Sequence, residues 1–370
     1  MNMIISKKKN QIGLKDKMSL YPKILALRME RQGFNKRLDR DEYHQLFRLM
    51  SPVVPMYWTM PGNPPVIQHR ADFSDFHYND KLRSRREIVK GRFQGGSVGY
   101  VFFDEIELYI ALYKKNIGKI TPKMDEIINL IEHEGPINVK GMKEVLGMYV
   151  KDITPILHKL QMAFIVFEDQ RSVEWDRGWY VFEREFPDIN LTKYTFQSAL
   201  KIIIERFQKL MIWFDVKMVE TVYKLPKKLI QVSIDELVQE NKFQLLEIEG
   251  DTGYISIEDY NLIHHLDLNQ TTNQIFCMNK NDFYVKAMEY ILQKDFPKTT
   301  HEPMYYLLHQ GEFIGAVYGK FRIRPDELED VIITKDIEQM VLRKDDIIKA
   351  IGKVADYSVS PLKRFMGEKR

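Results

Sequence analysis

The chain has 370 residues and a mass of 44.0 kDa, which is too long for one ordinary hydrophobic core and predicts two to four domains. Hydrophobic residues make up 44% and charged residues 29%, and no apolar run approaches the ~20 residues of a membrane span, so disordered and transmembrane classes are excluded. The one cysteine, Cys277, excludes an internal disulfide and any zinc site built on two cysteines of the chain. It favours a reducing compartment, and we expect a cytoplasmic globular protein.

The charges are nearly balanced in total, with 55 basic and 52 acidic residues, but they are unevenly distributed. Residues 1–40 hold eleven Lys and Arg against three acidic residues, and residues 81–92 hold six against one. Residues 232–267 hold nine acidic residues against one lysine. Such clusters are either solvated faces of stable domains or local fields that attract a partner. The second interpretation predicts that the N-terminal third faces a polyanion.

The first predicted unit is irregular. A helix over about 41–50 is followed by a Pro- and Gly-rich insertion at 61–65 and by a basic helix around 81–86. A β-hairpin follows, with strands at 87–93 and 98–103. Alternating β-branched and aromatic residues around glycines are typical of hairpins.

The second predicted unit consists of three helices and a hairpin. Apolar residues recur at helical spacing, at Met124, Ile127, Ile128 and Ile131. A short helix over about 139–146 and a stripe from Ile153 to Leu160 then lead into strands at 163–167 and 179–182. Three helices before a hairpin indicate a winged helix, a helix-turn-helix with an added β-wing.

The third predicted unit repeats this plan. A long helix from about 200 to 214 and a helix at 216–224 precede a third helix that ends near 240. The hairpin strands are 243–248 and 254–257. Because this unit is acidic, its surface repels phosphate groups, and we assign the unit to scaffolding or protein contacts.

After residue 270 the pattern changes to strands. A strand at 275–278, a hairpin of 304–308 and 313–318, a strand at 331–333 and a C-terminal helix from about 336 predict a small antiparallel β domain, barrel-like, with a covering helix. The predicted fold is therefore α+β and helix-rich. Three tandem winged-helix domains, over 1–120, 121–190 and 191–270, precede the β-containing domain 271–370.

Several residues of catalytic type have simpler interpretations. The glycines between Gly91 and Gly99 lack the Gly-Lys-Ser/Thr ending of a phosphate-binding loop and are better explained by a hairpin turn. His264-His265 and His301 have no third or fourth ligand at helical or hairpin spacing, so no metal is expected. Cys277 lies in an apolar strand and is expected to be a buried thiol. No cofactor is predicted.

The candidate nucleic-acid contacts lie in the first unit. Basic side chains bind phosphates, and aromatic side chains beside them can stack exposed bases. For Trp58, packing in a core is an equal alternative. The predicted DNA-binding residues are Arg83, Arg85, Arg86, Lys90, Arg92, Tyr57 and Trp58.

The order of these units resembles the winged-helix DNA glycosylases of the AlkZ/YcaQ type. The likeness includes the opening helix at 24–33, the arginine-led hairpin beginning Arg85-Arg86-Glu87, both later winged helices and the final domain. Members of that family excise alkylated bases and unhook interstrand crosslinks. The resemblance therefore implies a DNA-repair protein that binds double-stranded DNA.

The sequence departs from this family where the catalytic motif belongs. The family places Gln-x-Gln or Gln-x-Asp after the helix that here ends at Met50, and this chain has Ser51-Pro52-Val53. The family hairpin often carries Thr-Leu-His, and this chain has no imidazole there. No catalytic residue can be transferred, so the catalytic residues are unknown. The nearest substitutes in sequence are His69, Asp72 and Asp75.

Three functions remain open at this point. The leading expectation is a DNA-binding protein of the AlkZ-like family, related to DNA repair, with glycosylase activity absent or altered. The second is an active DNA glycosylase that uses a non-standard carboxylate. The third is a winged-helix regulator or scaffold whose acidic third unit binds a protein partner. None of the three involves a membrane.

Overall fold

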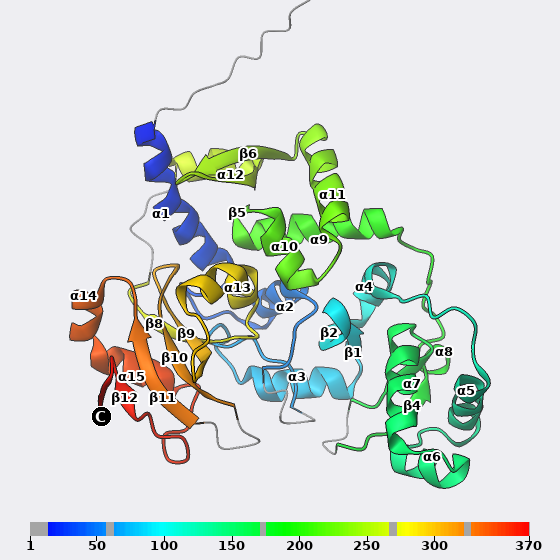
Figure 1. The fold of residues 1–370 in the computed structure, drawn as a ribbon. Coiled ribbons are helices and arrows are strands. Elements are labelled where there is room, and N and C mark those ends of the chain that lie inside the picture. Colours follow the sequence, from blue (N-terminus) through cyan, green and yellow to red (C-terminus); the bar gives the residue numbers. More distant parts are fainter. Residues whose placement is uncertain (1–13, 57–62, 171–174, 266–271, 322–326, 370) are drawn as a thin grey trace, which may run out of the picture.

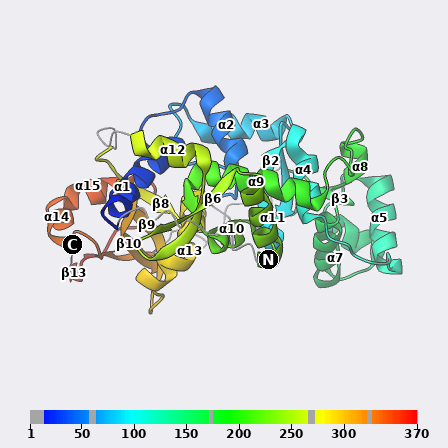
Figure 2. The ribbon, with the colours of Figure 1, turned by 90° about the horizontal axis from the view of Figure 1, so that it is seen from above.

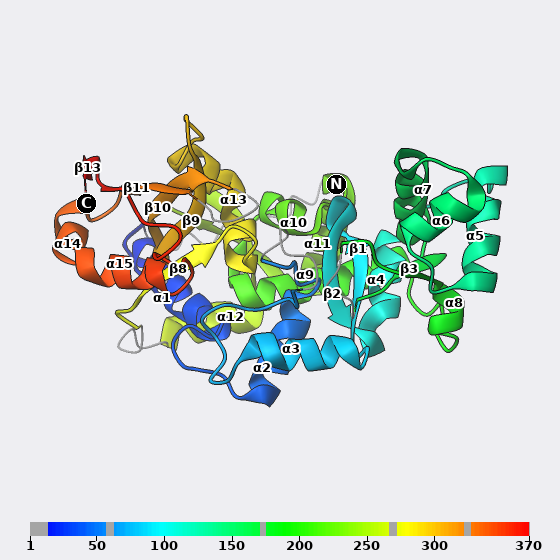
Figure 3. The ribbon, with the colours of Figure 1, turned by 90° about the horizontal axis from the view of Figure 1, so that it is seen from below.

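The computed structural model describes residues 14–56, 63–170, 175–265, 272–321 and 327–369, and it shows a helix-rich α+β chain (Figure 1). None of the helices in these ranges is both long and apolar enough to cross a membrane. The C-terminal unit lies at one end of the molecule and the second unit at the other, with the hairpin β1–β2 between them (Figures 2 and 3).

The first unit is built around this hairpin. Asp39 caps its first helix through a capping box with Glu42, and Ser74 caps the next one. A 3-10 turn joins the strands, in which Gly95 and Gly96 take φ values of 73° and 91° that favour glycine, as the hairpin prediction required. The elements are α2 (Arg40–Met50), α3 (Asp75–Ser84), β1 (Ile88–Phe93), β2 (Ser97–Phe102) and α4 (Ile106–Tyr113).

The opening helix α1 (Leu14–Arg31) precedes the first unit in sequence but packs against a later one. It packs against the third unit, where the Arg28 guanidinium donates to the carbonyl oxygens of Met211 at 2.9 Å and Trp213 at 3.1 Å. Residues of the first and third units therefore share one core with α13 (Phe283–Asp295). The domain limits expected at 120, 190 and 270 remain predictions.

The second unit has the predicted order of three helices and a hairpin. Thr121 and Asn138 cap the first two helices, and Gly147 ends the second in the left-handed conformation. The predicted apolar stripes form a separate core that includes Ile131 and Leu157. The elements are α5 (Pro122–Glu134), α6 (Val139–Leu146), α7 (Val150–Met162), β3 (Val166–Glu168), β4 (Trp179–Val181) and the short helix α8 (Phe182–Glu185).

The third unit adds a strand that the sequence did not reveal. The long helix ends at Met211 rather than continuing to 214, because Ile212 takes a positive φ of 65° and Trp213 then pairs with Ile255. The resulting sheet has the order β5-β7-β6. The elements are α9 (Phe196–Met211), β5 (Trp213–Phe214), α10 (Val216–Tyr223), α11 (Lys227–Gln239), β6 (Phe243–Ile248), β7 (Asp251–Ser256) and α12 (Ile257–His265).

The C-terminal unit is an open sheet, which corrects the barrel-like expectation. Its four described strands run antiparallel in the order β11-β10-β9-β8, so β11 and β8 are edges and the sheet does not close. Helix α15 packs against β8, and Cys277 is buried between them as predicted. The remaining elements are β8 (Ile275–Asn279), β9 (Glu302–His309), β10 (Glu312–Lys320), β11 (Glu327–Ile333), α14 (Ile337–Leu342), α15 (Lys344–Gly352), β12 (Arg364–Phe365) and β13 (Glu368–Lys369).

Candidate nucleic-acid interface

Two members of the predicted basic cluster face the protein interior. The Lys90 ammonium is buried and forms an ion pair with Glu168 of the second unit. Burial lowers the pKa of Lys90, and the Glu168 carboxylate opposes that decrease. Arg83 is also buried, and its Nε donates to the Asp80 carboxylate at 2.7 Å. Neither charge is available to a phosphate in this arrangement.

Arg92 and Arg86 join the first unit to the second. Arg92 Nε donates to Gln161 Oε1 at 2.8 Å, and another of its nitrogens lies 2.8 Å from His158 Nε2. Arg86 forms an ion pair with Glu185 and lies over three aromatic rings, 5.4–5.8 Å from their centroids. These rings belong to Phe167, Tyr180 and Phe186.

Gln170 completes this contact between units. Its amide oxygen accepts from the backbone N–H of Lys90 at 2.8 Å, and its amide nitrogen donates at 2.7 Å to the carbonyl oxygens of Arg83 and Ile88. The basic cluster therefore serves mainly to hold the hairpin against the second unit. Arg85, whose side chain is 69% exposed, is the member best placed to reach a phosphate, and its role in DNA binding stays a prediction.

We expect Arg86→Ala to lower the stability of the protein by about 1–2 kcal/mol, because it removes an ion pair and the cation–π contacts. Arg86 has a φ of 59°, and alanine keeps that backbone strain, so the change reports on the side chain alone. The neighbouring Arg85→Ala is the control and should leave the melting temperature unchanged. Equal melting temperatures for the two variants would contradict the assigned contact.

The aromatic pair Tyr57 and Trp58 lies outside the described residues. The residues nearest in sequence to the expected motif, His69, Asp72 and Asp75, lie within the described ranges. None of them lines the pocket described below. His69 is half-buried, with Nε2 2.8 Å from the Cys277 carbonyl oxygen, and loss of solvent lowers its pKa to about 4. Asp75 accepts from the backbone N–H of Ile67 at 3.1 Å, and Asp72 is exposed.

The segment Ser51-Pro52-Val53, where the resemblance places the family's motif, packs along the hairpin. Val53 pairs with Tyr100 through two backbone hydrogen bonds of 2.9 Å. A side chain at Gly99 would come within 3.0 Å of Pro52 Cβ, so glycine allows this close approach. The Ser51 hydroxyl is fully buried and donates to the Phe47 carbonyl oxygen at 2.8 Å. It is therefore bound to its own helix rather than directed at a ligand.

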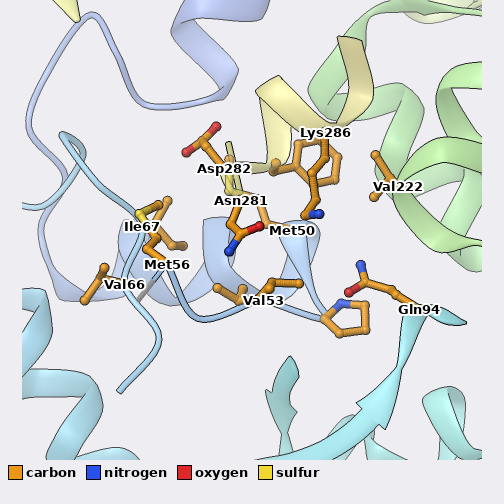
Figure 4. A pocket seen from close by; sticks show the side chains of 13 residues that line it. Met50, Val53, Met56, Val66, Ile67, Gln94, Val222, Asn281, Asp282 and Lys286 are labelled. Atoms are coloured by element: carbon orange, nitrogen blue, oxygen red, sulfur yellow. The ribbon is translucent and has the colours of Figure 1, made fainter. Parts of the chain in front are cut away.

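A pocket opens beside this segment, where four parts of the chain meet. Its walls come from the residues after α2, from the hairpin turn, from α10 and from the start of α13 (Figure 4). The hollow measures about 360 Å³, part of it open to solvent, and only about 20 Å³ admits a water-sized sphere. That interior is close to the space one water molecule needs. The lining residues include Met50, Pro52, Val53, Gln94, Val222, Asn281, Asp282 and Lys286.

Lys286 is the one lysine of this lining. No hydrogen bond or ion pair is made by its ammonium within the described part of the chain. Burial lowers its pKa, the nearby Glu289 carboxylate opposes the decrease, and Lys224 and Lys280 add to it. Lys286 thus lies near two further lysines, neither of which belongs to the pocket lining.

The other polar groups of the pocket differ in their availability. The Gln94 side chain is buried, with 5% exposure, and its amide oxygen has no hydrogen-bond partner. The Asn281 amide nitrogen donates to the Pro55 carbonyl oxygen at 3.0 Å. The Asp282 side chain points away from the hollow (Figure 4). Its carboxylate pairs with Arg70 and accepts a hydrogen bond from the Tyr284 backbone N–H at 2.9 Å. The pocket therefore offers an amine and an amide oxygen, while its carboxylate is occupied.

Sequence reasoning missed both Lys286 and Gln94. Gln94 was assigned only to a turn, and Lys286 lies far along the chain from the lost motif. One signal was present: Lys286 interrupts an apolar run of Phe283, Tyr284, Val285 and Ala287, which are all buried. In the described ranges, no three His, Cys, Asp or Glu side chains gather closely enough to hold a metal ion.

Three units of helices and a hairpin, followed by an open antiparallel sheet, define the architecture of this α+β chain. A solved structure with the same fold is Streptomyces sahachiroi DNA glycosylase AlkZ, with a TM-score of 0.63 and 10% sequence identity. The similarity covers 93% of this chain and 99% of that one. No family model and no curated protein sequence matches the chain. The chain therefore has an AlkZ-like fold with a strongly divergent sequence, which confirms the resemblance predicted for the fold.

Proposed function

We propose that this chain is a DNA-binding protein of DNA repair whose glycosylase activity is absent or altered. The observation that carries the proposal is the pocket beside Ser51-Pro52-Val53, the place where the resemblance puts the family's motif. Lys286 lies in the lining of this pocket, and Lys224 and Lys280 lie near its amine. The AlkZ-like fold over most of the chain supports a role on DNA. The absence of an amide or carboxylate side chain from Ser51-Pro52-Val53 supports a change in the chemistry.

An active glycosylase with a non-standard carboxylate has less support. Asp282 is the acidic residue of the described pocket lining, and its carboxylate is fully buried against the Arg70 guanidinium. A general base needs a free acceptor within hydrogen-bond reach of the attacking water. The paired Asp282 does not provide one.

A scaffold acting through the acidic third unit also has less support. Two of its acidic residues, Glu236 and Glu240, both pair with Lys201. Part of the negative charge is therefore neutralised within the unit, which weakens the electrostatic reason for a basic protein partner. Binding to double-stranded DNA remains the better-supported interaction.

We expect the chain to bind duplex DNA with weak sequence preference and with an affinity that falls as salt rises. Arg85→Gln and Lys224→Gln should each weaken binding on all sequences. Each should also reduce the steepness of log K against log salt by about 0.9, the contribution of one phosphate contact. Fluorescence anisotropy with labelled duplexes between low and physiological salt measures both effects.

Lys335→Gln is the matched control for Lys224→Gln. Both lysine side chains are 45% exposed, and each lies near one glutamate, Lys335 at 2.9 Å from Glu312 and Lys224 at 3.8 Å from Glu289. Lys335 follows β11, away from the pocket, so its loss should change neither affinity nor slope. Binding that ignores salt, or that responds equally to both lysine changes, would contradict an interface at the pocket.

A further inference from the structure

Lys286 is placed at the pocket by the start of its helix. Asp282 caps α13, and the same carboxylate is fixed by Arg70, which is itself fully buried. Lys286 follows one turn later, and its side chain extends into the hollow together with Gln94 (Figure 4). The backbone position of Lys286 is therefore set by buried contacts at the helix start.

The surroundings of Lys286 favour its neutral, nucleophilic form. Apolar side chains that include Met50, Val53 and Val222 line the hollow around it. Its pKa is lowered by this burial, and the positive charges of Lys224 and Lys280 lower it further. A desolvated lysine beside other cations is a recognised way to activate an amine toward carbonyl groups.

The unpartnered Gln94 oxygen is a second, independent sign of a ligand. A buried amide oxygen without a hydrogen-bond donor destabilises the protein unless a ligand or water satisfies it. A ligand for this pocket should therefore carry a hydroxyl group near the group that meets the amine. The small interior admits the edge of such a molecule but not a purine ring.

We propose that Lys286 forms a Schiff base with the aldehyde of an abasic site in DNA. This inference rests on the proposed DNA-binding function and deepens it. An abasic site carries its aldehyde at the sugar carbon that a glycosylase attacks, and the pocket stands at the place of the family's catalytic motif. The C4′ hydroxyl of its open-chain aldehyde form is a donor for the Gln94 oxygen, and its flanking phosphates suit Lys224 and Lys280, which lie near Lys286.

The step is a condensation that releases water. The lone pair of the neutral Lys286 amine attacks the aldehyde carbon, a C–N bond forms, and the carbonyl electron pair moves to the oxygen, which takes up a proton. The nitrogen loses a proton to give a neutral carbinolamine. The carbinolamine then expels its hydroxyl group with a proton as water, leaving a C=N bond between Lys286 and the sugar.

Borohydride trapping tests this inference. The protein is mixed with a labelled duplex that contains one abasic site, and sodium borohydride reduces any imine to a stable amine. We expect a covalent complex on a denaturing gel, and mass spectrometry of its digest should place the sugar on Lys286. The adduct should fall to background in Lys286→Met and Lys286→Arg, whereas Lys335→Gln should retain it.

Two different Lys286 variants are used so that loss of the adduct can be distinguished from loss of folding. Methionine suits the apolar walls and arginine keeps the charge, so both should keep the wild-type melting temperature. Trapping that persists in either variant, or that maps to another amine, would overturn the assignment. Binding of abasic duplex without any adduct would sink this inference and leave the proposed function intact. Failure to bind abasic and undamaged duplex alike would remove both.

Discussion

The wild-type chain is expected to release no measurable 7-methylguanine from alkylated duplex DNA while it still binds that DNA. The Ser51 hydroxyl donates to its own helix, Pro52 has no N–H, and Val53 is apolar. General-base assistance is worth roughly 10²–10⁴ in rate, so its loss should leave little excision. The narrow pocket also has no room for a methylated purine in its present form. Chromatography of the bases released over time measures the result.

Two controls make this experiment decisive. Heating the same DNA releases 7-methylguanine and shows that the lesion was present, and anisotropy shows that the protein was bound. Robust release at moderate temperature would mean that another group activates water. Asp72→Asn and Asp75→Asn would then be tested separately. Activity that survived both changes would place the catalytic group elsewhere, although neither carboxylate lines the pocket.

Arg70→Met is expected to cost about 3–5 kcal/mol of stability, the largest effect of any single change considered, because it leaves a buried carboxylate without its partner. Arg70 and Asp282 have side-chain exposures of 0% and 1%. The Arg70 guanidinium also donates to the Gln32 carbonyl oxygen at 2.8 Å and lies 4.2 Å from the centre of the Phe34 ring. Melting and denaturant unfolding followed by intrinsic fluorescence measure the loss.

An exposed ion pair provides the comparison for Arg70. Lys363, with 54% of its side chain exposed, pairs with Glu329 at 2.9 Å. Lys363→Met should cost at most about 1 kcal/mol, as is usual for surface pairs. If Arg70→Met were no more damaging than Lys363→Met, the buried pair would not be what joins the first unit to α13.

Elements that depend on local pattern were predictable from the sequence. The helical stripes of the second unit became α5 and α7, because apolar side chains spaced by one turn need a single buried face. The glycines at 95 and 96 took the positive φ values of a tight turn. The open sheet and the two-residue strand β5 were missed, since both depend on pairing between distant residues.

The amino-acid sequence by itself therefore determined the order of helices and hairpins and the AlkZ-like plan of the fold. Only the tertiary structure decided how the charges are used. Lys90 forms an ion pair with Glu168 of the second unit, so a lysine that the sequence suggests for DNA binding is buried and paired inside the protein. Lys286 and Gln94 line the same pocket as Val53 although the chain separates them widely. The physical reason is that burial and charge pairing depend on contacts between units, which no local pattern of residues records.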